Sequence, residues 1–321
     1  MTADAGTGAG KRRGQRRVDL VLLGVPIVWG VNYAVIKVAL RELEPLAFNA
    51  IRFALATLTI WVLARRMGAP LRIPRRRVWS LALLGLLGNT VYQLVFIAGI
   101  ARTTASNASL IMAAVPVIVA LLGTASGSER LRGRGWAGVT LAAVGLVLLL
   151  SAGPRSGYDR GNLGGDLLML AAASTWALYT LLGASLMART QSLGATLVTF
   201  LAGTPVLLLA AIPSFVRQDW RAVGVAGWAG VGFSGIVAIA LAYLAWNTGL
   251  GAIGGTRTAV YSNLTPVVAA TVAWLTLGER WGPGQLVGAI AVLLGIVLTQ
   301  GGLAHRRRPS AGAVEPGEGA G

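Results

Sequence analysis

The sequence has no cysteine, a single histidine and few charged residues. Only 12% of its 321 residues are charged, whereas 55% are hydrophobic. Soluble domains carry about 25% charged residues, so this composition excludes an ordinary soluble protein. Without cysteine there are no disulfide bonds, and cysteine usage leaves the redox compartment undetermined.

Acidic residues are scarce as well, and their positions exclude several kinds of chemistry. All 11 Asp and Glu residues fall in tails, in loops or at the ends of apolar segments, and none lies near a segment centre. Metal sites need clustered carboxylate, His or Cys ligands, so we expect no metal site and no cofactor. The same absence disfavours a membrane enzyme that acts on lipid, and it removes the usual carboxylate for proton coupling within a membrane.

Long apolar segments account for most of the chain. They lie at residues 18–40, 46–64, 78–100, 103–125, 135–153, 164–187, 193–215, 226–248, 256–276 and 284–303. Each has about the 20 residues that cross a bilayer as a helix, whereas a β-barrel would show alternating segments of about ten residues. The pattern predicts an all-α integral membrane protein with ten transmembrane helices in contact with the lipid bilayer.

A long internal duplication divides these ten segments into two groups of five. Residues 116–148 align with residues 266–298 at an offset of 150 without a gap, and an offset of 147 relates the beginnings of the two groups. Matched pairs include Pro116/Pro266, Glu129/Glu279, Gly138/Gly288, Gly145/Gly295, Trp29/Trp176, Phe53/Phe200 and Thr57/Thr204. A repeat of this length indicates that the fold consists of two related units.

Each unit crosses the membrane an odd number of times, so the second unit enters from the opposite side. The pattern therefore predicts two inverted five-helix repeats, a feature of alternating-access transporters whose substrate binds near the midplane between the repeats. The alternative interpretation is a duplicated helical scaffold without transport. The predicted parts are a basic cytoplasmic tail (1–17), the first repeat (18–153), an external linker (154–163), the second repeat (164–303) and a disordered cytoplasmic tail (304–321).

The net charge of +17 suggests nucleic-acid binding at first sight, but the basic residues lie in loops and tails between apolar spans. We therefore expect the lipid surface, and no nucleic acid, as their partner. With the N-terminus inside, 19 Lys and Arg residues face the cytoplasm and seven face the exterior. This excess predicts that both termini are cytoplasmic.

Two basic residues, Lys37 and Arg52, fall within apolar spans. A charge at the centre of a membrane helix costs at least about 3 kcal/mol. For Lys37, which lies near a helix end, we favour an extended side chain that reaches the outer headgroups. For Arg52, which lies deeper, this arrangement and an inward orientation stay equally open; an inward Arg would suit an anionic group such as a substrate carboxylate.

Polar and aromatic residues at helical spacing form the candidate binding site. Because unpartnered polar side chains are unfavourable in lipid, these residues are expected to face the protein interior or a water-filled cavity. The alternative is hydrogen bonding between helices without a ligand. As a set, they predict a central pocket for a small-molecule substrate. The candidates are Trp29, Asn32, Tyr33, Arg52, Asn89, Gln93, Trp176, Tyr179, Tyr243, Asn247, Tyr261 and Asn263.

Proline and glycine occupy matched positions in the two repeats. Pro116 and Pro266 lie in the middle of their spans, where the missing backbone donor and the resulting bend predict either a hinge or a static kink. Two glycine pairs, each seven residues apart and therefore on one helix face, allow close helix packing. They predict either a homodimer contact or packing within the chain. These pairs are Gly138/Gly145 and Gly288/Gly295.

Together these motifs resemble the EamA-type members of the drug/metabolite transporter superfamily, over residues from about 18 to 303. The resemblance implies ten helices in two inverted halves around a central cavity, and export of small metabolites, often amino acids, across the bacterial inner membrane. It departs from the family pattern at Thr199-Phe200, where the Arg-Phe pair is not repeated, and at Ser128, where the second repeat has Gly. The motifs are Trp29-Gly30 and Trp176, Arg52-Phe53, Pro116 and Pro266, Ser128-Glu129-Arg130 and Gly278-Glu279-Arg280, and the Gly138–Gly145 and Gly288–Gly295 helices.

The sequence thus predicts a secondary transporter of the bacterial plasma membrane that exports a small polar or amphipathic metabolite by alternating access. The predicted partners are lipid, the substrate and, if the glycine faces allow it, a second copy of the chain. Two alternatives stay open. One is an uncoupled facilitator of small-solute diffusion, consistent with the missing membrane carboxylate, and the other is a non-transporting scaffold.

Overall fold

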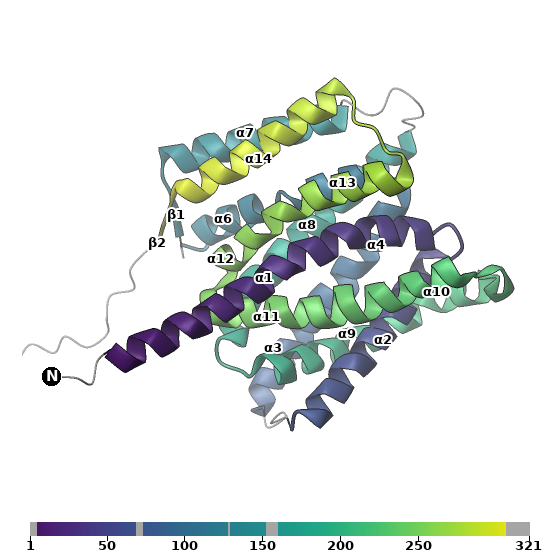
Figure 1. Ribbon diagram of the computed structural model, residues 1–321, viewed down its shortest axis with the longest axis horizontal. Coiled ribbons are helices and arrows are strands. Elements are labelled where there is room, and N and C mark those ends of the chain that lie inside the picture. Colours follow the sequence, from purple (N-terminus) through teal and green to yellow (C-terminus); the bar gives the residue numbers. More distant parts are fainter. Residues whose placement is uncertain (1–4, 69–72, 128, 152–159, 306–321) are drawn as a thin grey trace, which may run out of the picture.

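The computed structural model describes residues 5–68, 73–127, 129–151 and 160–305, and nearly all of this part is helical (Figure 1). The first repeat consists of α1 (Ala5–Ala39), α2 (Pro45–Arg66), α3 (Arg75–Gly85), the π-helical segment η1 (Leu86–Val91), α4 (Tyr92–Arg102), α5 (Ala105–Met112), α6 (Val115–Ala125) and α7 (Gly133–Ser151).

The second repeat has the same order of helices. It consists of α8 (Arg160–Met187), α9 (Ser192–Arg217), the 3₁₀ turn η2 (Trp220–Ala222), α10 (Val225–Gly232), the π-helical segment η3 (Phe233–Leu241), α11 (Ala242–Ile253), α12 (Gly255–Tyr261), the 3₁₀ turn η4 (Ser262–Leu264), α13 (Thr265–Leu277) and α14 (Pro283–Gly301). Two short strands, β1 (Glu129–Leu131) and β2 (Leu303–His305), pair antiparallel.

Ten apolar helical crossings form the described part of the chain. Nine are long and apolar enough to span a membrane, and the helix over 133–149 is a shorter apolar tenth. The prediction of an all-α integral membrane protein built from two inverted five-helix repeats is confirmed. Large apolar side chains cover the outer surface that faces lipid, for example Leu83, Val147, Leu209 and Leu275.

The termini differ from the predicted tails. The first helix begins at Ala5 rather than near residue 18, so the basic run at 11–17 continues the helix. The tail predicted from residue 304 was wrong for its first two residues, because β2 includes them and pairs with β1. The remaining parts of the predicted tails and linker, at 1–4, 152–159 and 306–321, lie outside the described residues, as does Ser128.

Two crossings in each repeat are interrupted at matching places. The third crossing contains a π-helical segment, η1 in the first repeat and η3 in the second. The fourth crossing is broken just before its proline, so that Pro116 lies in the first turn of α6 and Pro266 in the first turn of α13. Proline is tolerated there because the first helical turn lacks internal N–H partners. The interrupted helices bring side chains from several turns into the centre.

Residues that the two sequence offsets equate contact one another in space. The Trp29 and Trp176 rings lie 5.7 Å apart, and the Phe53 and Phe200 rings stack at 5.7 Å. Two further equivalent pairs are joined by hydrogen bonds, Thr57 Oγ1 to Thr204 Oγ1 at 2.8 Å and Gln93 Nε2 to Tyr243 Oη at 2.7 Å. A residue meets its own equivalent only near a two-fold axis, so a pseudo-two-fold axis runs between the repeats.

The last helices of the two repeats, α7 and α14, lie side by side along the top of Figure 1. Their glycine faces meet: a Cβ added at Gly138 would lie 2.6 Å from the Gly295 carbonyl oxygen, and one at Gly145 would lie 2.8 Å from that of Gly288. The small faces therefore serve packing within the chain. Of the two interpretations of these glycines, the structure supports packing within the chain, and a homodimer stays a prediction.

Candidate substrate-binding cavity

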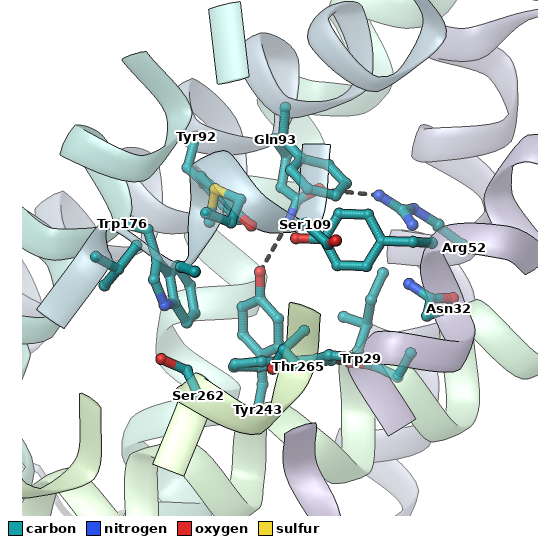
Figure 2. A pocket seen from close by; sticks show the side chains of 17 residues that line it. Trp29, Asn32, Arg52, Tyr92, Gln93, Ser109, Trp176, Tyr243, Ser262 and Thr265 are labelled. Carbon is teal, nitrogen blue, oxygen red and sulfur yellow. Dashed lines mark hydrogen bonds between the residues drawn. The ribbon is translucent and has the colours of Figure 1, made fainter. Parts of the chain in front are cut away.

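A cavity lies between the two repeats, on the pseudo-two-fold axis. It contains about 620 Å³ of space that no atoms fill, including the part open to solvent. Figure 2 shows Arg52 and Asn32 entering it from one side and Trp176 from the other. Its lining is Trp29, Asn32, Tyr33, Arg52, Tyr92, Gln93, Phe96, Ser109, Met112, Ala113, Val115, Trp176, Ala238, Ile239, Tyr243, Ser262 and Thr265.

Seven of the predicted site residues line this cavity. They come from both repeats, four from α1 and α2 and the others from α4, α8 and α11. Trp176 and Tyr243 come from the second repeat, so neither repeat forms the cavity alone. The seven are Trp29, Asn32, Tyr33, Arg52, Gln93, Trp176 and Tyr243.

Arg52 is the charged group of the cavity. Its side chain is 1% exposed, and it points inward rather than toward the headgroups. Nε donates to Asn49 Oδ1 at 2.9 Å, Nη2 donates to Gln93 Oε1 at 3.1 Å, and Cζ lies 5.1 Å from the centre of the Phe48 ring. Within the described residues no carboxylate pairs with it, so the guanidinium group faces the cavity without a negatively charged partner.

Gln93 connects this charge to the second repeat. Its Oε1 accepts from Arg52, and its Nε2 donates to the Tyr243 hydroxyl at 2.7 Å (Figure 2). Both polar ends of the glutamine are therefore used, which fixes its rotamer and amide orientation. A change at Arg52 can reach the second repeat through these two bonds.

Aromatic rings form the rest of the wall. Trp29 donates its indole N–H to the Ala238 carbonyl oxygen at 2.9 Å, which joins α1 to the π-helical segment η3 of the other repeat. Its ring lies 5.1 Å from that of Trp246 and 6.2 Å from that of Tyr243, and Tyr33 contacts Phe96 at 5.9 Å. Such ring pairs stabilise one another beyond the area they bury and present a rigid apolar surface to a ligand.

Five predicted site residues do not line the cavity. Tyr179 and Asn247 form a separate buried cluster, in which the Tyr179 hydroxyl donates to Asn247 Oδ1 at 2.9 Å and Asn247 Nδ2 donates to Thr196 at 2.9 Å. These bonds between helices match the alternative interpretation of the polar residues for these two. Tyr261 donates to Asp19 at 2.7 Å, at the end of the molecule where α1 enters the membrane.

Asn89 and Asn263 are the other two. Asn89 is fully buried, and both polar atoms of its amide lack a partner within the described residues. It lies in the π-helical segment η1, against Gly203 of α9. Its contact with α9 places the Asn89 side chain in the helix packing rather than in the cavity lining. Asn263 lies in the 3₁₀ turn η4, with its side-chain oxygen buried and unpartnered in the described part.

Several lining residues were not predicted. Tyr92 and Phe96 flank Gln93 on α4, and their positions one before and three after it could have indicated them. Ser109, Met112, Ser262 and Thr265 come from the broken fourth crossings, where 109 and 262 lie near the two prolines. Met112 and Ser262 lie four residues before Pro116 and Pro266, a position that could have indicated them, whereas short hydroxyl residues such as Ser109 and Thr265 are common in apolar helices and carry no such signal.

Lys37 also differs from the interpretation favoured above. Its ammonium group donates to the carbonyl oxygens of Thr103 at 2.8 Å and Ile100 at 3.3 Å, at the C-terminal end of α4. Helix C-termini leave carbonyl oxygens without partners and carry a partial negative charge. These acceptors hold Lys37 within the protein, and the side chain does not extend to the headgroups.

Carboxylates tie the repeats together at one membrane end, where α1, α4, α9 and α13 end; we call it the α4–α5 end. Glu279 accepts from the backbone N–H groups of Ala105 and Ser106 at 2.9 and 3.0 Å and from the Ser106 hydroxyl at 2.5 Å. Glu42 accepts from the N–H groups of Gly224 and Gly227 at 2.9 and 3.1 Å. Each carboxylate thus sits at the positive N-terminus of a helix of the other repeat.

The arrangement suits the binding of a small molecule. The cavity offers one fixed cation, amide and hydroxyl groups and aromatic rings. Among the described residues there is no group of three or more His, Cys, Asp or Glu side chains that could hold a metal ion. Such a cavity can recognise a small amphipathic molecule through its charge and its apolar part.

Comparison with known proteins identifies relatives over nearly the whole chain. The model of the EamA-like transporter family matches residues 16–151 and 163–300, once for each repeat. An Escherichia coli (strain K12) protein named "Probable amino-acid metabolite efflux pump" is 31% identical over 93% of this chain and 99% of its own length. A Streptantibioticus cattleyicolor protein named "Probable terminal-alkyne amino-acid exporter" is 28% identical over 88% of this chain and 93% of its own. A solved crystal structure, 20% identical, has the same fold, with a TM-score of 0.66 over 86% of this chain and 94% of that one.

Proposed function

The chain belongs to the EamA-like transporter family, and we propose that this multi-pass membrane transporter exports a small carboxylate-bearing metabolite, an amino acid or a similar compound, by alternating access. The substrate would bind in the cavity between the repeats. The proposal places the protein in a bacterial plasma membrane with both termini in the cytoplasm, because basic residues are concentrated in the loops on that side.

One observation carries the proposal: a buried cation without an anionic partner faces a cavity between inverted repeats. Burying a charge is costly unless it is paired. Two amide oxygens and the Phe48 ring compensate Arg52 only in part. A negatively charged substrate group would complete the set of partners, and its binding would offset the cost that the empty cavity carries.

The seven lining residues are assigned distinct roles in this proposal. Arg52 binds the anionic group, Gln93 and Tyr243 hold Arg52 in place, and Asn32 and Tyr33 donate to other polar atoms. Trp29 and Trp176 enclose the apolar part of the substrate. Of the remaining predicted residues, we propose that Asn89, Tyr179, Asn247, Tyr261 and Asn263 support the surrounding helices.

Alternating access requires one membrane end to close while the other opens. The bonds of Glu279 and Glu42 support the α4–α5 end as the closed end, because both cross between the repeats. Their release would let the repeats separate there. The breaks before Pro116 and Pro266 are the proposed hinges, since the interrupted helices need little energy to bend at those points.

Counterflow in proteoliposomes tests the proposal. Vesicles are loaded in turn with unlabelled amino acids, 2-hydroxy acids, nucleosides, sugars and cationic dyes, and the entry of the matching labelled compound is followed. Saturable exchange of carboxylate compounds is expected from the wild type and from Arg65→Gln, a variant of an exposed arginine outside the cavity. Exchange confined to sugars or dyes, or no exchange by folded protein, contradicts the proposal.

Uncoupled diffusion is a second candidate, favoured by the lack of a carboxylate among the cavity residues of the described chain. Proton-coupled membrane proteins commonly use a buried acid. A proton gradient imposed across loaded vesicles separates the two possibilities. Uphill accumulation of substrate would exclude the uncoupled facilitator, whereas equilibration without accumulation would support it.

A further inference from the structure

The cavity carries a positive charge that nothing in its lining balances. Arg52 is its one charged side chain, and none of the lining residues of the described chain is Asp or Glu. The ion pair of Arg217 with Glu44, at 3.9 Å, lies on the exposed surface of the α4–α5 end, away from the cavity. A ligand that brings one negative charge would therefore leave the occupied cavity neutral.

The free hydrogen-bonding groups of the cavity also favour a negatively charged ligand. Arg52 Nη1 and Asn32 Nδ2 have no acceptor within the described residues, so both are free to donate to a ligand. The amide oxygens are already engaged: Asn32 Oδ1 accepts from Ser234 at 2.6 Å, and Gln93 Oε1 accepts from Arg52. Figure 2 shows the nitrogen ends of Arg52 and Asn32 turned toward the cavity. The lining thus requires acceptors from its ligand.

An ammonium group would have poor partners in this site. It needs about three acceptors, best including a carboxylate, and the side chains that line the cavity offer hydroxyl groups and amide oxygens that already accept a bond, but no carboxylate. Aromatic faces can also bind cations, but the rings of Trp176 and Tyr179 stack on each other and Trp29 packs against Trp246. The Arg52 charge would in addition repel a second cation. Burying an ammonium group here is therefore unfavourable.

We infer that the cavity selects organic carboxylates with a net negative charge and an apolar body, such as 2-hydroxy acids, over the zwitterionic amino acids of the same shape. This inference rests on the proposed function only in taking the cavity as the transport site. It narrows the substrate class by charge, because the two kinds of compound share a carboxylate and differ in whether an ammonium group must also be buried.

Matched ligand pairs test the selection directly. Dissociation constants are measured by isothermal titration on the purified full-length protein for 3-phenyllactate against phenylalanine, and for 2-hydroxy-4-methylpentanoate against leucine. Each pair exchanges a hydroxyl for an ammonium group on one carbon skeleton. We expect the hydroxy acids to bind about tenfold or more tightly, the ratio typical of a charged group left without its partner. Phenethylamine, which has the ammonium group alone, is expected not to bind.

Variants show whether Arg52 is the source of the preference. Arg52→Gln is expected to weaken hydroxy-acid binding by about 10- to 100-fold and to bring the two members of each pair to similar affinity. Arg52→Lys keeps the charge and is expected to retain a preference for the hydroxy acid, while Arg65→Gln should match the wild type. Thermal melting of each variant separates loss of binding from loss of fold, and the wild-type ratio tests the inference without any variant.

Equal or tighter binding of the amino acids overturns the inference, as does the absence of binding by both hydroxy acids. A preference that survives in folded Arg52→Gln would also contradict it. These failures differ from failure of the proposed function. Saturable counterflow of amino acids without counterflow of hydroxy acids would retain the transporter and reject the charge selection, whereas no counterflow of any compound would reject the transporter itself.

Discussion

The two repeats have the same order of helices, but the residues at one pair of equivalent positions differ in charge. In the first repeat Arg52 is a buried cation that faces a hollow, whereas its equivalent in the second repeat, Thr199, donates to the Thr196 carbonyl oxygen at 2.7 Å within a filled region. Asn49, which holds Arg52, is likewise matched by Thr196, which accepts from Asn247. The region around Arg52 is therefore charged and opens into the cavity, whereas the matched region around Thr199 is a neutral hydrogen-bonded core.

The difference shows how a duplicated chain acquires a function. Positions on the axis keep the same or complementary residues because each contacts its own equivalent, as Phe53 does with Phe200 and Thr57 with Thr204. Positions away from the axis contact different neighbours and are free to diverge. In the proposed function, a single arginine in one repeat then gives the site its selectivity while the shared helices stay intact.

The largest effect, loss of the folded protein, is expected from placing an arginine at the equivalent position of the second repeat. Thr199→Arg would bury a cation in the neutral core, where Thr199 is 0% exposed and the described surroundings hold no acid. An unpaired buried charge costs about 3–5 kcal/mol or more, so we expect loss of the folded protein. Fluorescence-detected size exclusion and thermal melting check this. Thr199→Val, which keeps the shape, is the control, and a stable Thr199→Arg protein would contradict the comparison.

Removing the positive charge of Arg52 should leave the fold intact and strongly reduce transport. Arg52→Ala deletes the cationic partner of the substrate, with an expected loss of about 1.5–3 kcal/mol in binding, or about 10- to 100-fold in transport rate at low substrate concentration. Membrane insertion should be unchanged, because the variant removes a buried charge from an apolar span. Counterflow and the amount of protein in the membrane are measured together. Wild-type transport by Arg52→Ala would reject its role.

The contacts between the repeats at the α4–α5 end can be loosened selectively. Glu279→Gln removes the charge that accepts from Ala105 and Ser106, which weakens bonds worth about 1.5–3 kcal/mol. A cysteine placed in the cavity, as Ser109→Cys, reports how accessible the cavity is from that end. We expect it to react with an impermeant thiol reagent added from that end about tenfold faster in the Glu279→Gln background than with Glu279 intact. The native chain has no cysteine, so the labelling is free of background. Glu44→Gln, at an exposed ion pair on the same end, is the control.

A smaller loss of transport is expected from removing the hydrogen bond between Gln93 of the first repeat and Tyr243 of the second. Tyr243→Phe removes the hydroxyl that accepts from Gln93 and leaves the glutamine N–H without its partner. The loss is about 1 kcal/mol, so transport should fall about fivefold. Combining Tyr243→Phe with Arg52→Ala should give little further loss, since the chain from Tyr243 to Arg52 is already broken. Full additivity of the two losses in a double-mutant cycle would show that Gln93 does not couple Arg52 to Tyr243 of the second repeat.

The smallest effect, a loss of stability, is expected at Thr57 and Thr204, equivalent positions that hold threonine in both repeats. Thr57→Val removes the 2.8 Å bond to Thr204 and leaves one buried hydroxyl unpaired, at a cost of about 0.5–1.5 kcal/mol in stability. The double variant Thr57→Val with Thr204→Val should recover most of this loss, because no hydroxyl is then left without a partner. Thermal melting in detergent measures both. Equal losses in the single and double variants would argue that the pair does not contribute as a unit.

Periodicity and polarity predicted seven of the residues that line the cavity. Trp29, Asn32 and Tyr33 lie on one face of α1, which is continuous through that stretch, so helical spacing was enough to group them. Asn89 does not line the cavity; it lies in the π-helical segment η1 and packs against Gly203 of α9, a contact that spacing along one helix does not reveal. Tyr179 and Asn247 satisfy the same criterion as the lining residues, since each is polar and interior, but they bond to each other.

The sequence by itself determined the number of crossings, the duplication and the rule that polar residues face inward. These follow from the hydrocarbon thickness and from the cost of unpaired polar groups in lipid, which act on each segment separately. Only the tertiary structure decided that Arg52 faces the cavity, that Lys37 caps α4 and that Glu279 joins the repeats. Each of these depends on a partner from a distant segment, and helical periodicity reveals the face of a helix but not the neighbour that meets it.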